Sequence, residues 1–138
     1  MRQLVTLLLS TCIVTVSACN SPTSTADDLT LAIPDGYIGS GSSVVAAVIN
    51  DGDDEVAIGS LPCVIGMERR VDAEWVAYGS LRLCTDEVVK VPARGAREAL
   101  VEMPREIGTW RLTLTVTSHS GRFTVRSRSF QTVGIVVN

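Results

Sequence analysis

The sequence predicts an all-β sandwich, and three observations support this fold class. From Leu29 onward, short runs of Val, Ile, Leu and Thr are separated by Gly, Asp, Asn and Pro at the intervals typical of sandwich strands. No segment has a helical period of useful length. The chain has 138 residues, of which 46% are hydrophobic. This size and composition suit one folded domain with a single modest core.

We expect an antiparallel sandwich of about seven to nine short strands with one disulfide. Each expected strand is a run of β-branched and aliphatic residues that ends at turn-forming residues. The expected strands span residues 29–33, 43–50, 55–60, 63–72, 74–78, 87–91, 96–103, 110–117 and 122–131.

The last two expected strands form the clearest pair. Apolar residues alternate with Arg and Thr along residues 110–117, which predicts a strand with one buried and one exposed face. Gly121 can take a positive φ in the turn after this strand. If Thr117 pairs with Arg122, Val116 lies opposite Phe123 on the inner face. A slip of one residue would turn every apolar side chain outward, so this register is favoured.

Residues 1–18 have the layout of a secretory signal, with Arg2 followed by an apolar stretch and then small residues. The apolar stretch is too short to span a bilayer, which takes about 20 residues. The segment Val16-Ser17-Ala18-Cys19 resembles the lipobox of bacterial lipoproteins. That resemblance implies removal of residues 1–18 and lipidation of Cys19. The alternative is an ordinary secretory cleavage that leaves Cys19 as an unmodified thiol.

Residues 19–28 are small and polar without apolar periodicity, so we expect a lipidated cysteine followed by a flexible tether. The folded domain is then residues 29–138. Lipid at Cys19 implies a membrane-anchored protein of the bacterial cell envelope. Asn20 stands where an Asp would favour the inner membrane in similar lipoproteins, so the outer membrane is favoured.

The cysteines that remain in the mature domain predict one disulfide. Cys12 leaves with the signal and Cys19 carries lipid, so Cys63 and Cys84 are the available pair in an oxidising compartment. A redox pair or a set of metal ligands is the alternative, but the spacing is not Cys-x-x-Cys and the chain has one His.

With these residues in place, residues 29–133 resemble a family of bacterial immunoglobulin-like domains found in secreted and lipid-anchored proteins of unassigned function. The resemblance implies an immunoglobulin-like sandwich that serves in adhesion, spacing or ligand binding, with no catalytic residues. Residues 92–95 depart from the Pro-Gly-Glu turn usual at that point. The matching segments are Val48-Ile49-Asn50-Asp51-Gly52, Cys63 through Met67-Glu68-Arg69-Arg70 to Trp75, Cys84, Gly108-Thr109-Trp110-Arg111 and, loosely, Ser127 to Val133.

Composition and spacing disfavour several kinds of site. A net charge of -3 leaves no excess of Lys and Arg for nucleic acid. We interpret Asp51, Asp53, Asp54 and Glu55 as a solvated turn, because they lack the spacing of a calcium-binding loop. His119 lies between Ser118 and Ser120 in a turn, where nothing orients it as a catalytic base. We therefore expect no metal, no cofactor and no enzymatic activity.

Four arginines form the one candidate site, a possible anion-binding face. In the expected register Arg111 lies opposite Arg128, Arg126 lies on the same exposed face, and Arg122 lies at the turn. Like charges directly opposite each other destabilise a sheet unless an anion relieves them. A carboxylate of the same domain is the favoured source, and a bound anion is the alternative. The candidate carboxylates are Glu68, Glu102 and Glu106.

These observations predict a lipid-anchored, non-catalytic binding or structural module. Its expected partners are the membrane, through the N-terminal lipid, and an unknown protein or envelope glycan. The alternative is a proteinase-inhibitor-like domain, because a bacterial inhibitor family has a similar sandwich with an early strand that ends in Asn. An enzyme ranks lowest.

Overall fold

The computed structural model describes residues 28–61, 63–79, 84–118 and 121–134. These residues form strands that pair into three sheets, so the predicted all-β fold is confirmed. The strands are β1 (Leu29–Ala32), β2 (Ile38–Gly39), β3 (Ser43–Asn50), β4 (Val56–Ile58), β5 (Ile65–Val71), β6 (Glu74–Tyr78), β7 (Val89–Val91), β8 (Gly95–Glu102), β9 (Gly108–Ser118), β10 (Gly121–Arg126) and β11 (Phe130–Val133).

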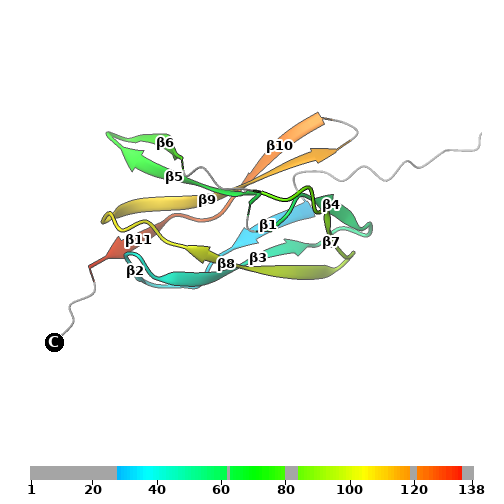
Figure 1. Ribbon diagram of the computed structural model, residues 1–138, viewed down its shortest axis with the longest axis horizontal. Coiled ribbons are helices and arrows are strands. Elements are labelled where there is room, and N and C mark those ends of the chain that lie inside the picture. The colour runs from blue at the N-terminus through cyan, green and yellow to red at the C-terminus, as the bar shows by residue number, and fades with distance from the viewer. Residues whose placement is uncertain (1–27, 62, 80–83, 119–120, 135–138) are drawn as a thin grey trace, which may run out of the picture.

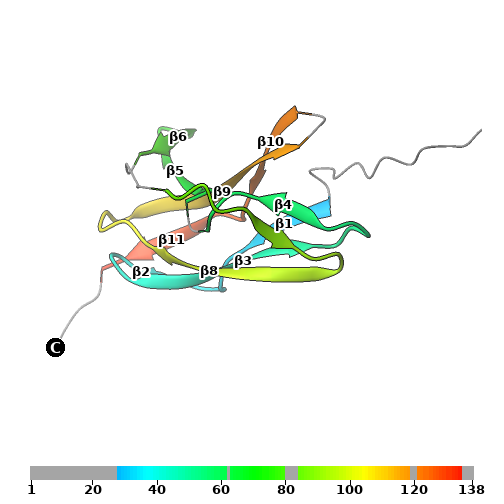
Figure 2. The ribbon, with the colours of Figure 1, turned by 45° about the vertical axis from the view of Figure 1, so that its right-hand side comes forward.

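Two sheets stack as the layers of a sandwich (Figure 1). One layer has the order β1-β3-β8, and the other has the order β2-β11-β9-β5-β6 with β10 beside β9. This strand order matches that of the A-B-E and G-F-C-C′ sheets of an immunoglobulin-type sandwich. Apart from the parallel pair of β2 and β11, the strands pair antiparallel. β4 and β7 form a separate two-stranded ribbon, which is labelled in Figure 1 and seen from another side in Figure 2.

The core lies between the two layers and is built by alternate residues of the central strands. Trp110, Leu112 and Leu114 of β9 are completely buried, and they belong to one core with Val48 of β3 and Val101 of β8. The expected alternation along this strand is therefore confirmed. Side chains alternate along each strand, so the residues between these core positions point away from the core. Each sheet therefore has an outer face as well as a core face.

One buried threonine satisfies the polar atoms beside the core tryptophan. The Thr132 hydroxyl accepts hydrogen bonds from Trp110 Nε1 and from the Gly108 amide, both at 3.0 Å. It donates to the Glu106 carbonyl at 2.8 Å. The Tyr78 ring packs edge-on against Trp110, with centroids 5.0 Å apart. These contacts fix the end of the core where β8 turns into β9.

The predicted hairpin register is correct along β10 and then changes. Thr117 pairs with Arg122 and Val116 pairs with Phe123, as expected, and Gly121 has a φ of 130°. If the β10 register continued, Phe130 would pair with Thr109, whose side chain points outward. Instead, Phe130 pairs with Trp110. One extra residue is thus accommodated between β10 and β11, as in a β-bulge.

This change of register corrects two expectations. The single strand expected over residues 122–131 is two strands, β10 and β11. The expected pairing of Arg111 with Arg128 is wrong, because the pairing of β10 with β9 ends at Arg126, the pairing of β11 begins at Phe130, and Arg128 lies in the segment between β10 and β11. With the unexpected β2, the described residues form eleven strands instead of seven to nine. β2 was not predicted because its two residues are too few to show periodicity.

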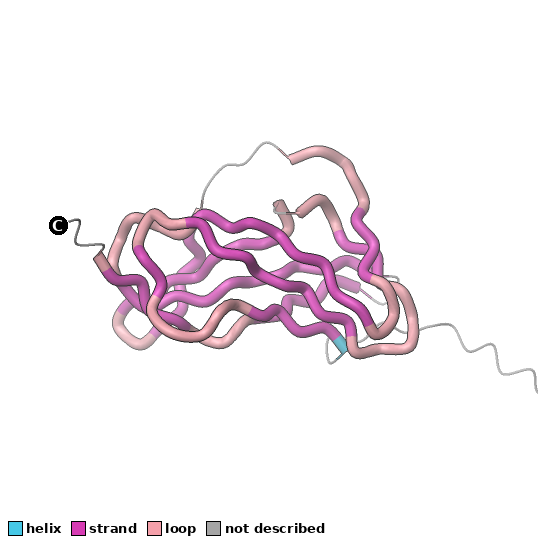
Figure 3. Tube along the Cα trace, turned by 90° about the horizontal axis from the view of Figure 1, so that it is seen from below, coloured by secondary structure: helices cyan, strands magenta, loops and turns pink. Residues whose placement is uncertain are grey.

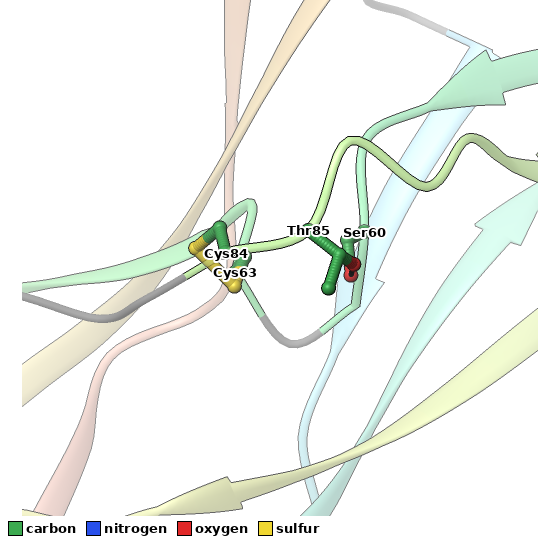
Figure 4. Close-up of a disulfide and its surroundings, with 4 residues drawn as sticks. All are labelled: Ser60, Cys63, Cys84 and Thr85. Atoms are coloured by element: carbon green, nitrogen blue, oxygen red, sulfur yellow. Dashed lines mark hydrogen bonds between the residues drawn. A yellow bond between two sulfur atoms is a disulfide. The ribbon is translucent and has the colours of Figure 1, made fainter.

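The predicted disulfide is present. Cys63 and Cys84 are bonded, with their Cα atoms 5.7 Å apart and a sequence separation of 21 (Figure 4). Beside it, the Thr85 hydroxyl donates to the Ser60 hydroxyl at 3.3 Å. The bond joins the segment before β5 to the segment after β6, so it closes the loop that contains the β5–β6 hairpin.

The described chain enters and leaves the sandwich at opposite ends (Figures 1 and 3). β1 begins at the end that holds the β3–β4 loop and the β7–β8 turn, where the Asp51 amide donates to the Asp28 carbonyl at 2.8 Å. β11 finishes at the other end. In the part of the chain that the structure describes, no helix is long and apolar enough to cross a membrane.

Candidate functional site

Three of the four predicted arginines lie on the outer face of the larger sheet. Arg122 and Arg126 are opposite Thr117 and Thr113 of β9, on the face away from the core. Arg111 lies on the same face of β9, since its neighbours Trp110 and Leu112 point into the core. The hairpin thus presents three guanidinium groups from two strands.

Arg128 does not belong to this face. Its guanidinium donates to the carbonyls of Ile33, at 3.3 Å, and Pro34. It also pairs with Asp35 at 3.0 Å. The side chain therefore ties the β1–β2 loop to the bulge before β11. The physical reason is the extra residue in the register, which removes Arg128 from the row of Arg126.

Glu68 supplies the internal carboxylate that the like-charged arginines require. Its Oε2 lies 2.5 Å from Arg111 Nε and 3.6 Å from Arg126 Nε. The Glu68 and Arg111 side chains are 18% and 20% exposed, whereas Arg126 is 46% exposed. The first pair is a short, half-buried hydrogen-bonded ion pair. The second is a longer contact at the surface, where ion pairs contribute little.

Trp75 of β6 brings a fourth arginine into the site. The Arg111 guanidinium lies over the Trp75 ring, 4.2 Å from its centroid, and the Arg70 guanidinium lies 5.8 Å from it. Arg70 and Trp75 are cross-strand partners in the β5–β6 hairpin. Guanidinium groups are attracted to the π-face of an aromatic ring. The ring therefore links Arg70 to Arg111 across β5.

We call this surface the basic face. It has four guanidinium groups and one carboxylate, so it carries a net charge of three positive units. Arg70 and Arg122 form no ion pair with any described residue. Guanidinium forks bind carboxylates and phosphates through paired hydrogen bonds. The members of the basic face are Glu68, Arg70, Trp75, Arg111, Arg122 and Arg126.

The other carboxylates considered for neutralisation lie elsewhere. Glu106 accepts hydrogen bonds from the Tyr78 hydroxyl at 3.0 and 3.2 Å. These bonds, together with partial desolvation, raise the pKa of Tyr78 above its ordinary value of 10.0. Glu102 is on β8, on the outer face of the smaller sheet. Of the three candidate carboxylates, Glu68 is the one that contacts the arginines.

The acidic turn after β3 is used in ion pairs. Asp53 accepts hydrogen bonds from Arg94 at 2.7 and 3.0 Å, which raises the pKa of that guanidinium. Glu55 pairs with Lys90 at 2.9 Å. Among the described residues, no group of three or more His, Cys, Asp or Glu could hold a metal ion. His119 and the lipidation candidate Cys19 lie outside the described residues.

Sequence reasoning missed Arg70 and Trp75 as members of the site, although a signal was present. Met67 of β5 points into the core. Side chains alternate along a strand, so Glu68 and Arg70 both point outward. The hairpin turn consists of Asp72 and Ala73, whose positive φ values of 47° and 69° make a tight two-residue connection. That turn places Trp75 directly opposite Arg70.

Comparison with known proteins found no matching family model and no matching curated protein.

Proposed function

We propose that this chain is a lipid-anchored protein of the bacterial cell envelope whose sandwich acts as a non-catalytic binding module. The lipobox-like segment at residues 16–19 supports the anchor, and the polar segment that follows supports a tether. The observation that carries the binding role is the basic face. Its single carboxylate serves two arginines and leaves the others available to a ligand.

The ligand of the basic face carries acidic groups. Arg70 and Arg126 are exposed at the two sides of the Glu68–Arg111 pair. A carboxylate or phosphate placed between them gains charge-assisted hydrogen bonds without displacing the half-buried pair. The face is built on strands, so these groups are held in fixed relative positions.

The outer membrane is the favoured site of anchoring, because Asn20 follows the cysteine proposed to be lipidated.

Retention of an unanchored form by isolated envelopes tests the binding role. The Cys19→Ser protein, which lacks the lipid, is expected to stay partly bound to envelopes at low salt through the basic face. Replacing Arg70 and Arg126 with Gln should remove most of this retention. Moderate salt should weaken the wild-type retention, since exposed charges are screened within about 10 Å at 0.1 M ionic strength.

Arg105→Gln is the matched control, because it removes one positive charge from the exposed β8–β9 loop, away from the basic face. It should leave retention unchanged. Equal retention of the double variant and the control would show that the basic face is not a binding surface. For the anchor, the Cys19→Ser change should move the protein from membranes to the soluble fraction after a high-salt wash.

A further inference from the structure

The outer face of the smaller sheet is apolar at its centre and acidic at one edge. Val45 of β3 and Leu100 of β8 are cross-strand partners that remain 46% and 62% exposed. Glu98 and Glu102 lie on either side of Leu100 along β8, and they point to the same side because side chains alternate along a strand. The rest of this outer face is small or aliphatic, namely Thr30, Ala32, Ser43, Ala47, Ile49 and Ala96. We call this surface the acidic face.

The acidic face has no internal neutralisation in the described part of the chain. Neither Glu98 nor Glu102 forms an ion pair there. The surface carries two negative charges and no positive one. The basic face, on the opposite side of the sandwich, carries three positive charges in net and an aromatic ring. The two flat outer surfaces of the molecule are therefore complementary in charge.

We propose that the acidic face of one copy of this chain docks on the basic face of a second copy. This inference rests on the proposed function, because it names the partner of the same basic face. Glu98 and Glu102 of one copy would meet Arg70 and Arg126 of the next. Leu100, which lies between the two glutamates, would meet the Arg111 side chain that covers Trp75. Opposite potentials of this kind favour this pairing and disfavour like-face contacts.

The geometry of anchored copies suits this contact. Strands of packed sheets lie within about 30° of each other, and the sheets are about 10 Å apart. Moving one copy along the stacking direction therefore sets its acidic face against the basic face of its neighbour while both keep the same orientation. The described part of the chain begins at one end of the sandwich (Figure 1), so copies in the same orientation all begin at the same end. Copies tethered there to one membrane surface would form open rows, since such a contact is heterologous and does not close.

The size of the acidic face indicates a weak contact that depends on the membrane. Three strands of up to eight residues cover on the order of 400 Å² in the plane of the sheet, from the usual strand spacing and rise. A stable interface buries about 800 Å² per partner. Tethering raises the effective concentration of a second copy, so weak faces associate on a membrane when they do not in dilute solution.

Site-specific cross-linking of the full lipidated chain in its native envelope tests the contact. A photoreactive residue at Leu100 should capture a second copy, and mass analysis should place the bond in the β5–β6 or β9–β10 hairpin. The same photoreactive residue at Tyr37, which is 75% exposed on the β1–β2 loop, is the matched control. A bond from Leu100 to Leu100, bonds to other proteins alone, or no bond would each overturn the proposal.

Charge reversal gives an independent readout. Glu98→Lys with Glu102→Lys should lower the yield of cross-linked pairs by about tenfold, because like charges then face each other. Arg70→Glu with Arg126→Glu should do the same. Co-expression of the two double variants should restore the pairs, since each supplies the face that the other needs. Glu87→Lys, an exposed change outside the strands, should have no effect. Failure of the mixed variants to pair would overturn the proposal.

The two proposals fail in different ways. If envelope retention depends on Arg70 and Arg126 but Leu100 captures no second copy, the basic face binds another acidic partner and the stacking is wrong. If the arginine variants change neither retention nor pairing, the binding role of the basic face is wrong as well.

Discussion

Asn50 is the residue whose replacement has the most defined expected effect on stability. It ends β3 and is completely buried. Its Nδ2 donates to the carbonyls of Asp54 at 2.8 Å and Pro92 at 3.1 Å, with the Val91 carbonyl at 3.3 Å. Its Oδ1 accepts from the Gly52 amide at 3.0 Å. One side chain thus joins the β3–β4 loop to the β7–β8 turn.

Replacing Asn50 with Ala removes all four of these contacts. Because the side-chain amide has two N–H groups, two of the three donated contacts share one hydrogen, so the loss corresponds to about three full hydrogen bonds and leaves the backbone groups without them. Each such bond contributes about 1 kcal/mol in net terms, so the free energy of unfolding should fall by about 3 kcal/mol. For a domain of this size, 1 kcal/mol corresponds to about 4 °C in Tm. We therefore expect a Tm lower by about 12 °C.

Thermal unfolding followed by circular dichroism, with the disulfide intact, measures this effect. Asn50→Asp keeps the shape of the side chain but replaces its donors with a carboxylate that faces carbonyl oxygens. It should destabilise at neutral pH at least as much as the Ala variant. Ser43→Ala, at the exposed other end of β3, is the control and should change Tm little. A loss of less than about 4 °C for Asn50→Ala would show that water replaces the amide and that the reasoning is wrong.

Three further predictions concern the hairpins and the disulfide. Replacing Cys63 and Cys84 with Ser should lower the free energy of unfolding by roughly 3 kcal/mol, measured by urea denaturation, because the cross-link restricts the unfolded chain. Ala73→Gly should raise stability by about 0.5–1 kcal/mol in the same assay, since Ala is strained at its φ of 69° and Gly is not; an unchanged or lower midpoint would contradict this. Glu106→Gln should lower the pKa of Tyr78 toward 10.0 in an NMR titration, because the carboxylate that accepts the hydrogen bond of the phenol and disfavours the phenolate is gone. The contribution of this bond to stability is present below pH 10.0 and lost as pH rises through the raised pKa.

The fold could be predicted where apolar runs end at turn-forming residues or where side chains alternate over several residues. The bounds of β3 and β6 follow from runs of β-branched and aliphatic residues that end at turns, the register of the β9–β10 hairpin follows from a period-two pattern, and each is confirmed. The bulge was missed, although its signal is in the sequence. Inward apolar residues have odd numbers at Phe123 and Val125 and an even number at Phe130. A change of parity within one strand indicates an inserted residue.

The bulge also explains why the site was predicted only in part. A regular strand would keep Arg128 in the row of Arg126, but it would then turn Phe130 to solvent. Burial of an aromatic ring contributes more than an exposed arginine pair, so the backbone shifts and Arg128 turns to the β1–β2 loop. The role of Asn50 was also hidden. The Asn matched the resembled family, yet two of its three acceptors, the carbonyls of Val91 and Pro92, lie 41 and 42 residues away in sequence.

The basic face combines a fixed part with an available part. Arg111 is held by a half-buried carboxylate and by the Trp75 ring, so its role is to keep that ring in place across β5. Arg126 contacts the same carboxylate at 3.6 Å from an exposed position. It can exchange this weak contact for a ligand carboxylate without uncovering a buried charge. Because Glu68 pairs closely with Arg111 and more loosely with Arg126, repulsion between these two arginines is reduced while the surface keeps a net positive charge. A single glutamate thereby makes this group of arginines compatible with a stable sheet and with the binding role proposed for this face.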